Sequence, residues 1–190
     1  NKVIDRGDNR LVDGDMGDQT IIGNTTPRYQ YTFNGYISWK GLSLSVMFQG
    51  VGKRDWVAGG AYFWGFGPYA QVTVFKEHMD YWRPDNPGAY YPKPYINSAG
   101  GVAPYQDKNI QRTDLYLQNA AYLRLKNITL GYSIPQTVLG KAGISRLRVY
   151  VQGENLLTFT PLIDAFDPEI INNMTYPITK KVSVGLNLTF

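Results

Sequence analysis

Residues 29–40, YQYTFNGYISWK, carry the clearest signal of the fold in this sequence. Aromatic residues, glycine and isoleucine occupy every second position, and mostly polar residues lie between them: Tyr29, Tyr31, Phe33, Gly35, Ile37 and Trp39 against Gln30, Thr32, Asn34, Tyr36, Ser38 and Lys40. A period of two sustained over this length predicts a β-strand. The predicted strand is longer than the roughly five or six residues usual in soluble proteins.

The same alternation predicts four further strands, at 42–52, 120–134, 146–155 and 180–190. Lys40 and Gly41 leave room only for a tight hairpin turn between the first two strands. In 120–134 the large aliphatic residues occupy odd-numbered positions before Lys126 and even-numbered positions after Asn127. This switch predicts a β-bulge at Lys126 and Asn127. The sequence therefore predicts an all-β chain of long antiparallel strands.

The connections between these strands alternate between long and short. Long connections are predicted at 1–28, 53–119 and 156–179, and short ones at 40–41 and 135–145, the latter with room for one helical turn. Residues 53–119 show no sustained period, although a short helix is expected near 74–81. Outer-membrane barrels combine short periplasmic turns with long extracellular loops. We therefore expect the three long connections to be extracellular loops, with the carboxy-terminus in the periplasm.

Strand length and face chemistry favour a transmembrane barrel. A tilted transmembrane strand needs about 9–11 residues. The polar faces carry charges that require water, namely Lys40, Arg124, Lys126, Arg148, Glu154 and Lys181. A soluble β-sandwich explains the alternation but neither the strand length nor the loop pattern. Because closed membrane barrels have about eight strands or more, the remaining strands are expected upstream in a longer protein.

Composition excludes several other classes of protein. The chain has no cysteine, which rules out disulfides and thiol chemistry. Its aromatic content of 14% suits a membrane interface. The net charge of +4 is spread out, with no cluster larger than Lys53–Arg54 or Lys180–Lys181, so nucleic-acid binding is not expected. No stretch approaches the roughly 20 apolar residues of a transmembrane helix.

Several segments, taken in order, resemble one family. They are GNTTPRY (23–29), residues 39–56, HMDYWRPDNPGAYYPKP (78–94), YLQNAAYLRLKNITLGYSIP (116–135), LRVYVQGENLLTFT (147–160) and GLNLTF (185–190). Together they resemble the C-terminal region of the SusC/RagA family of TonB-linked outer-membrane transporters, over nearly the whole chain.

This resemblance implies that the chain forms the last five strands of a 22-stranded barrel. It implies that the plug domain and the remaining barrel lie elsewhere in the polypeptide, and that a SusD-like surface lipoprotein and the TonB complex are partners. The cargo it implies is mostly oligosaccharide, with peptides in some members. It also implies that Phe190 is the terminal aromatic residue read by the barrel-assembly machinery.

The loop 53–119 holds the candidate binding residues, because it concentrates aromatic rings that can stack on sugars. The residues chosen for contact with cargo or with the lipoprotein are Trp56, Trp64, Tyr69, Trp82, Arg83, Tyr90 and Tyr91. The alternative is that these rings pack the loop on itself. One structural calcium ion is also considered, because Asn1, Asp5 and Asp8 resemble the second half of an EF-hand-like loop. A solvated acidic loop explains the same residues, and no other cofactor is expected.

No enzymatic site is predicted. His78 has no serine elbow or cysteine to complete a triad. Asp164, Asp167 and Glu169 can imitate a glycosidase pair, but they lie in a loop. The function that the resemblance implies is therefore energy-coupled import of oligosaccharides across the bacterial outer membrane. Import of peptides by the same fold and a passive porin-like channel stay open as alternatives.

Overall fold

A computed structural model describes residues 17, 19–65, 74–94, 112–140, 143–171, 176 and 178–190. The chain divides into two compact units. The sheet unit consists of Asn24–Trp56 and Gln118–Phe190, and the loop unit consists of Asn1–Gly23 and Val57–Leu117.

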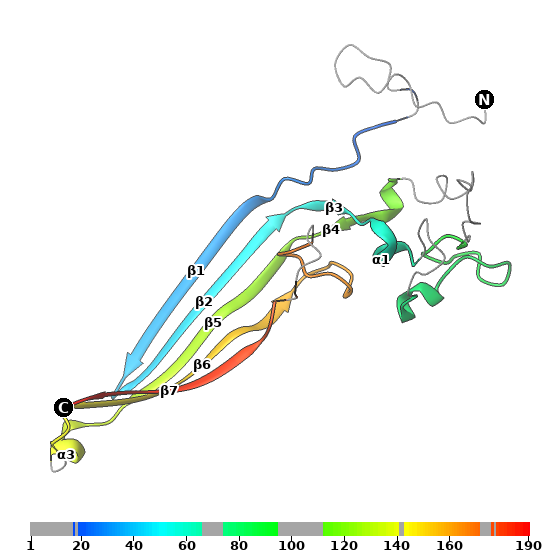
Figure 1. Cartoon of the computed structure of the whole chain (residues 1–190). Coiled ribbons are helices and arrows are strands. Elements are labelled where there is room, and N and C mark those ends of the chain that lie inside the picture. The colour runs from blue at the N-terminus through cyan, green and yellow to red at the C-terminus, as the bar shows by residue number, and fades with distance from the viewer. Residues whose placement is uncertain are drawn as a thin grey trace. The chain divides into compact units, whose positions relative to one another are not determined.

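The sheet unit is built on a single antiparallel sheet of five strands, ordered β1-β2-β5-β6-β7 (Figure 1). The strands are β1 (Arg28–Trp39), β2 (Leu42–Lys53), β5 (Tyr122–Ser133), β6 (Arg146–Phe159) and β7 (Lys181–Thr189). The order follows the chain, as expected when short turns and long loops join antiparallel neighbours. This confirms the predicted all-β antiparallel architecture.

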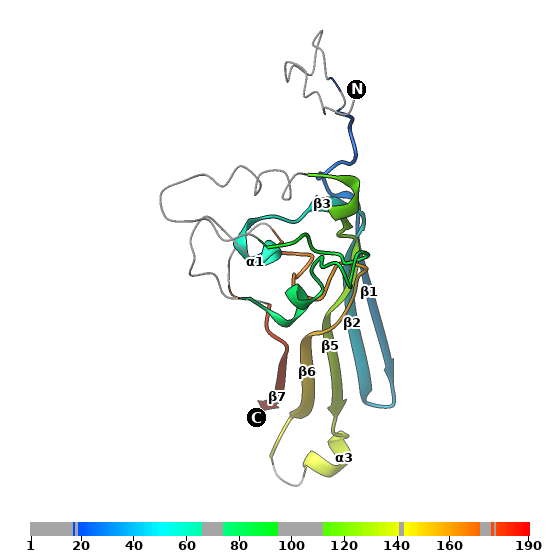
Figure 2. The ribbon, with the colours of Figure 1, turned by 90° about the vertical axis from the view of Figure 1, so that its right-hand side faces the viewer.

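The two short connections lie at the end of the sheet where the carboxy-terminus lies (Figure 1). Lys40 and Gly41 form the β1–β2 turn with φ angles of 44° and 88°. Two successive positive φ angles characterise the hairpin turn whose twist matches that of the strands. The other connection contains the short helix α3 (Gln136–Leu139), beyond the end of β5 (Figure 2).

A bulge interrupts the middle of the sheet. The β2–β5 register shifts between Met47 and Phe48, and the β5–β6 register shifts between Leu125 and Asn127. The predicted bulge is therefore present. Asn155 has a φ of 52°, which fits an extra residue in β6 at this level. The prediction that this strand ends at 155 was wrong, because the ladder resumes beyond the bulge and continues to Phe159.

One face of the sheet is apolar and largely uncovered. Its exposed large side chains come from all five strands: Phe33, Ile37, Trp39, Leu42, Leu130, Tyr132, Val149, Val151, Leu157, Phe159, Val182, Val184, Leu186 and Leu188. The polar residues between them lie on the other face, because successive side chains of a strand alternate. Among the described residues, no helix is both long and apolar enough to cross a membrane.

The region predicted as one long loop, 53–119, contains short elements. These are β3 (Asp55–Val57), α1 (Gly60–Trp64), the 3-10 helices η1 (Lys76–Met79) and η2 (Asp114–Tyr116), and β4 (Leu117–Asn119). β3 and β4 pair as a two-stranded sheet. The helix expected near 74–81 is the single 3-10 turn η1.

Candidate functional site

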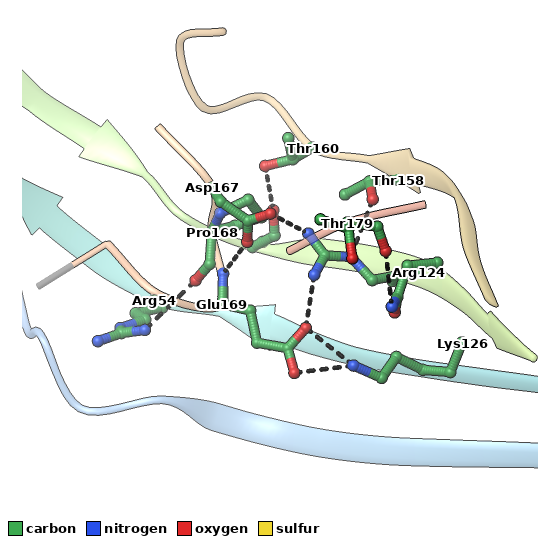
Figure 3. A network of polar contacts seen from close by, with 11 residues as sticks. Arg54, Arg124, Lys126, Thr158, Thr160, Asp167, Pro168, Glu169 and Thr179 are labelled. Atoms are coloured by element: carbon green, nitrogen blue, oxygen red, sulfur yellow. Dashed lines mark hydrogen bonds and ion pairs between the residues drawn. The ribbon is translucent and has the colours of Figure 1, made fainter. Parts of the chain in front are cut away.

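Arg124 is the centre of a polar network on the sheet unit (Figure 3). It lies on β5 opposite Thr158 of β6, and its side chain is 2% exposed. Its guanidinium donates to Asp167 Oδ2 at 2.6 Å, to Glu169 Oε2 at 2.7 Å and to Thr158 Oγ1 at 2.9 Å. A planar guanidinium with several fixed donors suits such a convergence of oxygen atoms.

Lys126 completes the network by donating to Glu169 Oε1 at 3.0 Å and Oε2 at 3.2 Å. Two cations therefore face two carboxylates. We expected both cations to need water. That expectation was wrong for Arg124, because the chain's own carboxylates replace water around its guanidinium.

Residues 160–171, here called the strap, carry these carboxylates and are also held by contacts outside this ion-pair network. Thr160 Oγ1 donates to the Ala121 carbonyl at 2.7 Å, and Arg54 Nη1 donates to the Pro168 carbonyl at 3.5 Å. The rings of Trp56 and Phe166 meet edge to face, with centroids 4.8 Å apart. The strap also buries two apolar side chains, Leu162 and Ile171.

The strap stabilises its own turn through Asp167. The Glu169 amide donates to Asp167 Oδ1 at 2.9 Å, and the Ile170 amide donates to the Asp167 carbonyl at 3.2 Å. Asp167 thus uses one carboxylate oxygen for the turn and the other for Arg124. Of the three carboxylates considered for a glycosidase pair, Asp167 and Glu169 are occupied in holding the strap.

The loop unit is organised around an aromatic cluster. Phe63 is fully buried, and its ring lies 4.7 Å from Trp64 and 5.5 Å from Tyr91. Tyr116 lies 4.7 Å from Trp64, and burial raises the pKa of its hydroxyl. Most of these contacts are edge to face, which is the favourable arrangement for ring quadrupoles.

His78 joins two elements of this cluster through both ring nitrogens. Its Nε2 lies 2.9 Å from the Phe63 carbonyl, and its Nδ1 accepts the Phe75 amide at 3.0 Å. With Nδ1 accepting, Nε2 is the nitrogen that donates to the carbonyl. His78 is buried, so it is a packed loop histidine that ties η1 to α1.

Residues 80–91, here called the Asp80 loop, fold back on themselves. The Trp82 amide donates to the Tyr91 carbonyl at 2.9 Å, and the Tyr91 amide donates to the Asp80 carbonyl at 3.0 Å. The Asp80 carboxylate accepts Asn86 Nδ2 at 3.0 Å and the Tyr90 amide at 3.2 Å. These hydrogen bonds lower the pKa of the Asp80 carboxyl, the one from Asn86 most strongly.

Sequence relatives of this chain are TonB-dependent receptors. TonB-dependent receptor P3 of Formosa agariphila is 31% identical over 91% of the chain, and TonB-dependent receptor P26 of the same organism is 28% identical over 91%. The chain belongs to the TonB-dependent receptor family, in its SusC/RagA branch. It spans 17% and 18% of the lengths of those two relatives. No protein-family profile matches the sequence.

Solved structures agree with this family. The RagAB peptide importer in its open-open state matches 95% of this chain and 20% of its own, with 29% identity and a TM-score of 0.64. The same importer in its closed-closed state matches 93% of this chain, with 28% identity and a TM-score of 0.67. The five strands are thus a fragment of a larger SusC/RagA-type barrel.

The structure separates the predicted contact residues of this SusC/RagA-type chain by exposure. Trp56, Trp64 and Tyr91 are buried, and Tyr90 is half-buried against Tyr91. Trp82 is 42% exposed. Whether any of them contacts cargo or the lipoprotein stays a prediction, but the buried rings have little surface left for it.

Arg83, also predicted to contact cargo, lies beside Trp82. It is paired with Asp85 at 3.4 Å, and its guanidinium carbon lies 5.2 Å from the Tyr81 ring centroid. Arg83 is partly exposed and Asp85 is exposed. Both side chains therefore keep surface that a ligand can reach.

For the other five predicted residues the structure describes no contacts that would define a site. Tyr69 and the calcium candidates Asn1, Asp5 and Asp8 lie outside the described residues. Phe190 follows the end of β7 and is 83% exposed, so its predicted role in assembly stays a prediction.

The sequence reasoning missed the strap. A signal was present, since two cations on a strand accompany two carboxylates in a later loop. The spacing alone did not show that they meet.

Proposed function

We propose that this chain forms part of the wall and outer loops of a transporter that imports oligosaccharides across the bacterial outer membrane with TonB-supplied energy. The observation that carries the proposal is the five-stranded antiparallel sheet with one bare apolar face, which matches importer structures over nearly its whole length. A bare apolar sheet face suits lipid, and the opposite polar face suits a wet lumen.

The proposed transporter includes parts outside this chain. The upstream polypeptide supplies the remaining barrel strands and the plug, through which the TonB complex acts. A SusD-like lipoprotein covers the outer mouth, where the predicted extracellular loops 1–28, 53–119 and 156–179 lie. The family relationship supports these partners, and the likeness to RagAB supports a two-component assembly.

Oligosaccharide is the preferred cargo because of the chemistry at Trp82. An exposed indole offers a flat apolar platform for a sugar ring. Arg83 and Asp85 stand next to it in the chain and can exchange hydrogen bonds with sugar hydroxyls. The backbone bonds of the Asp80 loop hold this group in shape before any ligand binds, which reduces the entropic cost of binding.

Peptide import is the second candidate. It is favoured by RagAB, described as a peptide importer, to which this chain is 29% identical. A porin-like channel is the third, and it predicts passage that needs no TonB complex.

Uptake by the complete transporter in its own host tests the proposal. Cells would receive fluorescent oligosaccharides or peptides, with and without an intact TonB complex. We expect TonB-dependent uptake of oligosaccharides. Uptake of peptides alone would contradict oligosaccharide import and support peptide import. Uptake that needs no TonB complex would support a porin-like channel.

The Trp82 platform is tested by Trp82→Ala in the same transporter. Loss of one stacking ring should weaken oligosaccharide binding by about 1–3 kcal/mol. Trp39→Ala is the matched control, because Trp39 is also exposed but lies on the apolar face of β1. Equal affinity of the wild-type protein and both variants would remove Trp82 from the binding site.

A further inference from the structure

The strap lies on one identifiable face of the sheet. Arg124 pairs in register with Gln49 of β2 and Thr158 of β6, so these three side chains share the polar face. Their neighbours Leu157 and Phe159 point to the other face, where they are 51% and 59% exposed. The strap therefore covers the polar face at this level and leaves the apolar face bare.

The polar face of a membrane barrel faces the lumen. A segment bound to that face occupies part of the lumen instead of projecting away from the barrel. We propose that the strap, residues 160–171, is a fixed constriction that sets the largest cargo the barrel passes, and that Arg124 is its positioning residue. This inference rests on the proposed transport function.

Several independent contacts make the strap a fixed feature. It is attached near its start by Thr160 to the Ala121 carbonyl, in its middle by Phe166 against Trp56, and near its end by Asp167 and Glu169 to Arg124. Lifting the strap would break the Thr160 hydrogen bond, the ring contact and both ion pairs together.

The charges indicate that this constriction selects by size. Arg124 and Lys126 are matched by Asp167 and Glu169 at 2.6–3.0 Å, so the four groups neutralise one another. A neutralised surface exerts little long-range attraction or repulsion on charged cargo. Passage of cargo then depends on the width of the opening that the strap leaves, and not on the charge of the strap.

The test releases the strap without removing bulk. Asp167→Asn combined with Glu169→Gln abolishes both carboxylate charges while keeping the side-chain sizes, and it is made in the complete transporter. Glu154→Gln is the matched control, because Glu154 lies on the polar side of β6 and hydrogen-bonds to Gln152 instead of the strap. Arg124→Lys is a second variant, which keeps the positive charge but loses the planar guanidinium that donates to both carboxylates at once.

Release of the strap is measured separately from transport. Leu162 is buried, and the chain has no cysteine of its own. A Leu162→Cys probe is added to each variant and treated with a membrane-impermeant maleimide. We expect several-fold faster labelling in the double variant than in the Glu154→Gln control.

Transport is measured with two ladders of fluorescent oligomers graded by length, one of oligosaccharides and one of peptides. We expect the double variant and Arg124→Lys to admit longer oligomers than the wild type, with uptake of the shortest ones unchanged. An unchanged upper length despite faster labelling would overturn the constriction. Unchanged labelling would overturn the role of the Arg124 ion pairs in holding the strap. If the wild type takes up neither ladder while the barrel is present at the surface, the proposed transport function fails first.

Discussion

The strap and the Asp80 loop are both connections between strands, but they obtain their shapes in different ways. The strap depends on partners far away in the chain, since Arg124 reaches Asp167 and Glu169 across 43 and 45 positions. The Asp80 carboxylate instead bonds residues 6 and 10 positions away. A connection shaped by distant strands forms only once the sheet exists, whereas one shaped locally can persist when its surroundings change.

Removing the Arg124 side chain should disturb the strap most. Arg124→Ala deletes three charge-centred hydrogen bonds, and bonds to charged groups contribute about 1.5–3 kcal/mol each. We expect the free energy that holds the strap to the sheet to fall by about 3 kcal/mol, while the Asp80 loop keeps its amide protection. Hydrogen exchange on the complete transporter measures both regions together.

Arg146→Ala is the control for this prediction, because Arg146 is an exposed arginine at the start of β6. Equal loss of protection in the strap and in the Asp80 loop would contradict the contrast between them.

The second prediction concerns Gly65→Ala in the loop unit. Gly65 has a φ of 68°, and an added Cβ would lie 2.5 Å from the His78 ring. His78 cannot easily move, because both its nitrogens are hydrogen-bonded. Strain in the left-handed region costs about 1–3 kcal/mol, so we expect a loss of about 2 kcal/mol in the stability of the aromatic cluster.

Near-ultraviolet circular dichroism and protease resistance of the loop unit measure that loss. Gly59→Ala is its control, because nothing lies within 4 Å of the added carbon. The strap should be unaffected by either variant. Faster maleimide labelling of Leu162→Cys in Gly65→Ala than in the wild type would show that the two regions are coupled.

Lys126→Ala should have a smaller effect than Arg124→Ala. Its ion pair with Glu169 is partly exposed, at 23% and 25%, and Glu169 keeps its bond to Arg124. Partly exposed ion pairs contribute about 0.2–1 kcal/mol. Labelling of the strap at Leu162→Cys should therefore rise only slightly. A rise as large as that of Arg124→Ala would show that Lys126 holds the strap as strongly as Arg124 does.

The smallest expected effect is that of acidification on the Asp80 loop, and it should be confined to that loop. The folded state lowers the pKa of Asp80 from its usual 3.8, so the carboxylate stabilises the loop above that pH. This contribution is lost as the pH falls below 3.8 through the folded-state pKa. A lower protection factor of the Tyr90 amide on acidification, with exchange compared to its intrinsic rate at each pH, is the expected signal. Asp80→Asn should make that protection factor independent of pH in this range.

The fold was readable from the sequence because β alternation is a local property. The face that a side chain occupies follows from whether its position in the strand is odd or even. YQYTFNGYISWK therefore predicted β1, and the change from odd to even apolar positions at Lys126 predicted the bulge. The end of β6 was misplaced, since Asn155 breaks the local pattern and the ladder resumes only because β5 continues beside it.

The candidate site was readable only in part. The sequence indicated which loop holds the aromatic rings, but it did not separate Trp82, which is exposed, from Trp56 and Trp64, which are buried. Exposure depends on which rings meet in three dimensions, and ring type alone carries no such information.

The strands, their two faces, the pattern of short and long connections and the family were all evident in the sequence. All of these follow from periodicity and from motifs within single segments. The burial of Arg124, its neutralisation by Asp167 and Glu169, and the position of the segment after β6 on the polar face became visible only in the folded chain. A charge on a strand can be satisfied equally by water or by a distant carboxylate, and which of the two it meets depends on the segments that the folded sheet brings together.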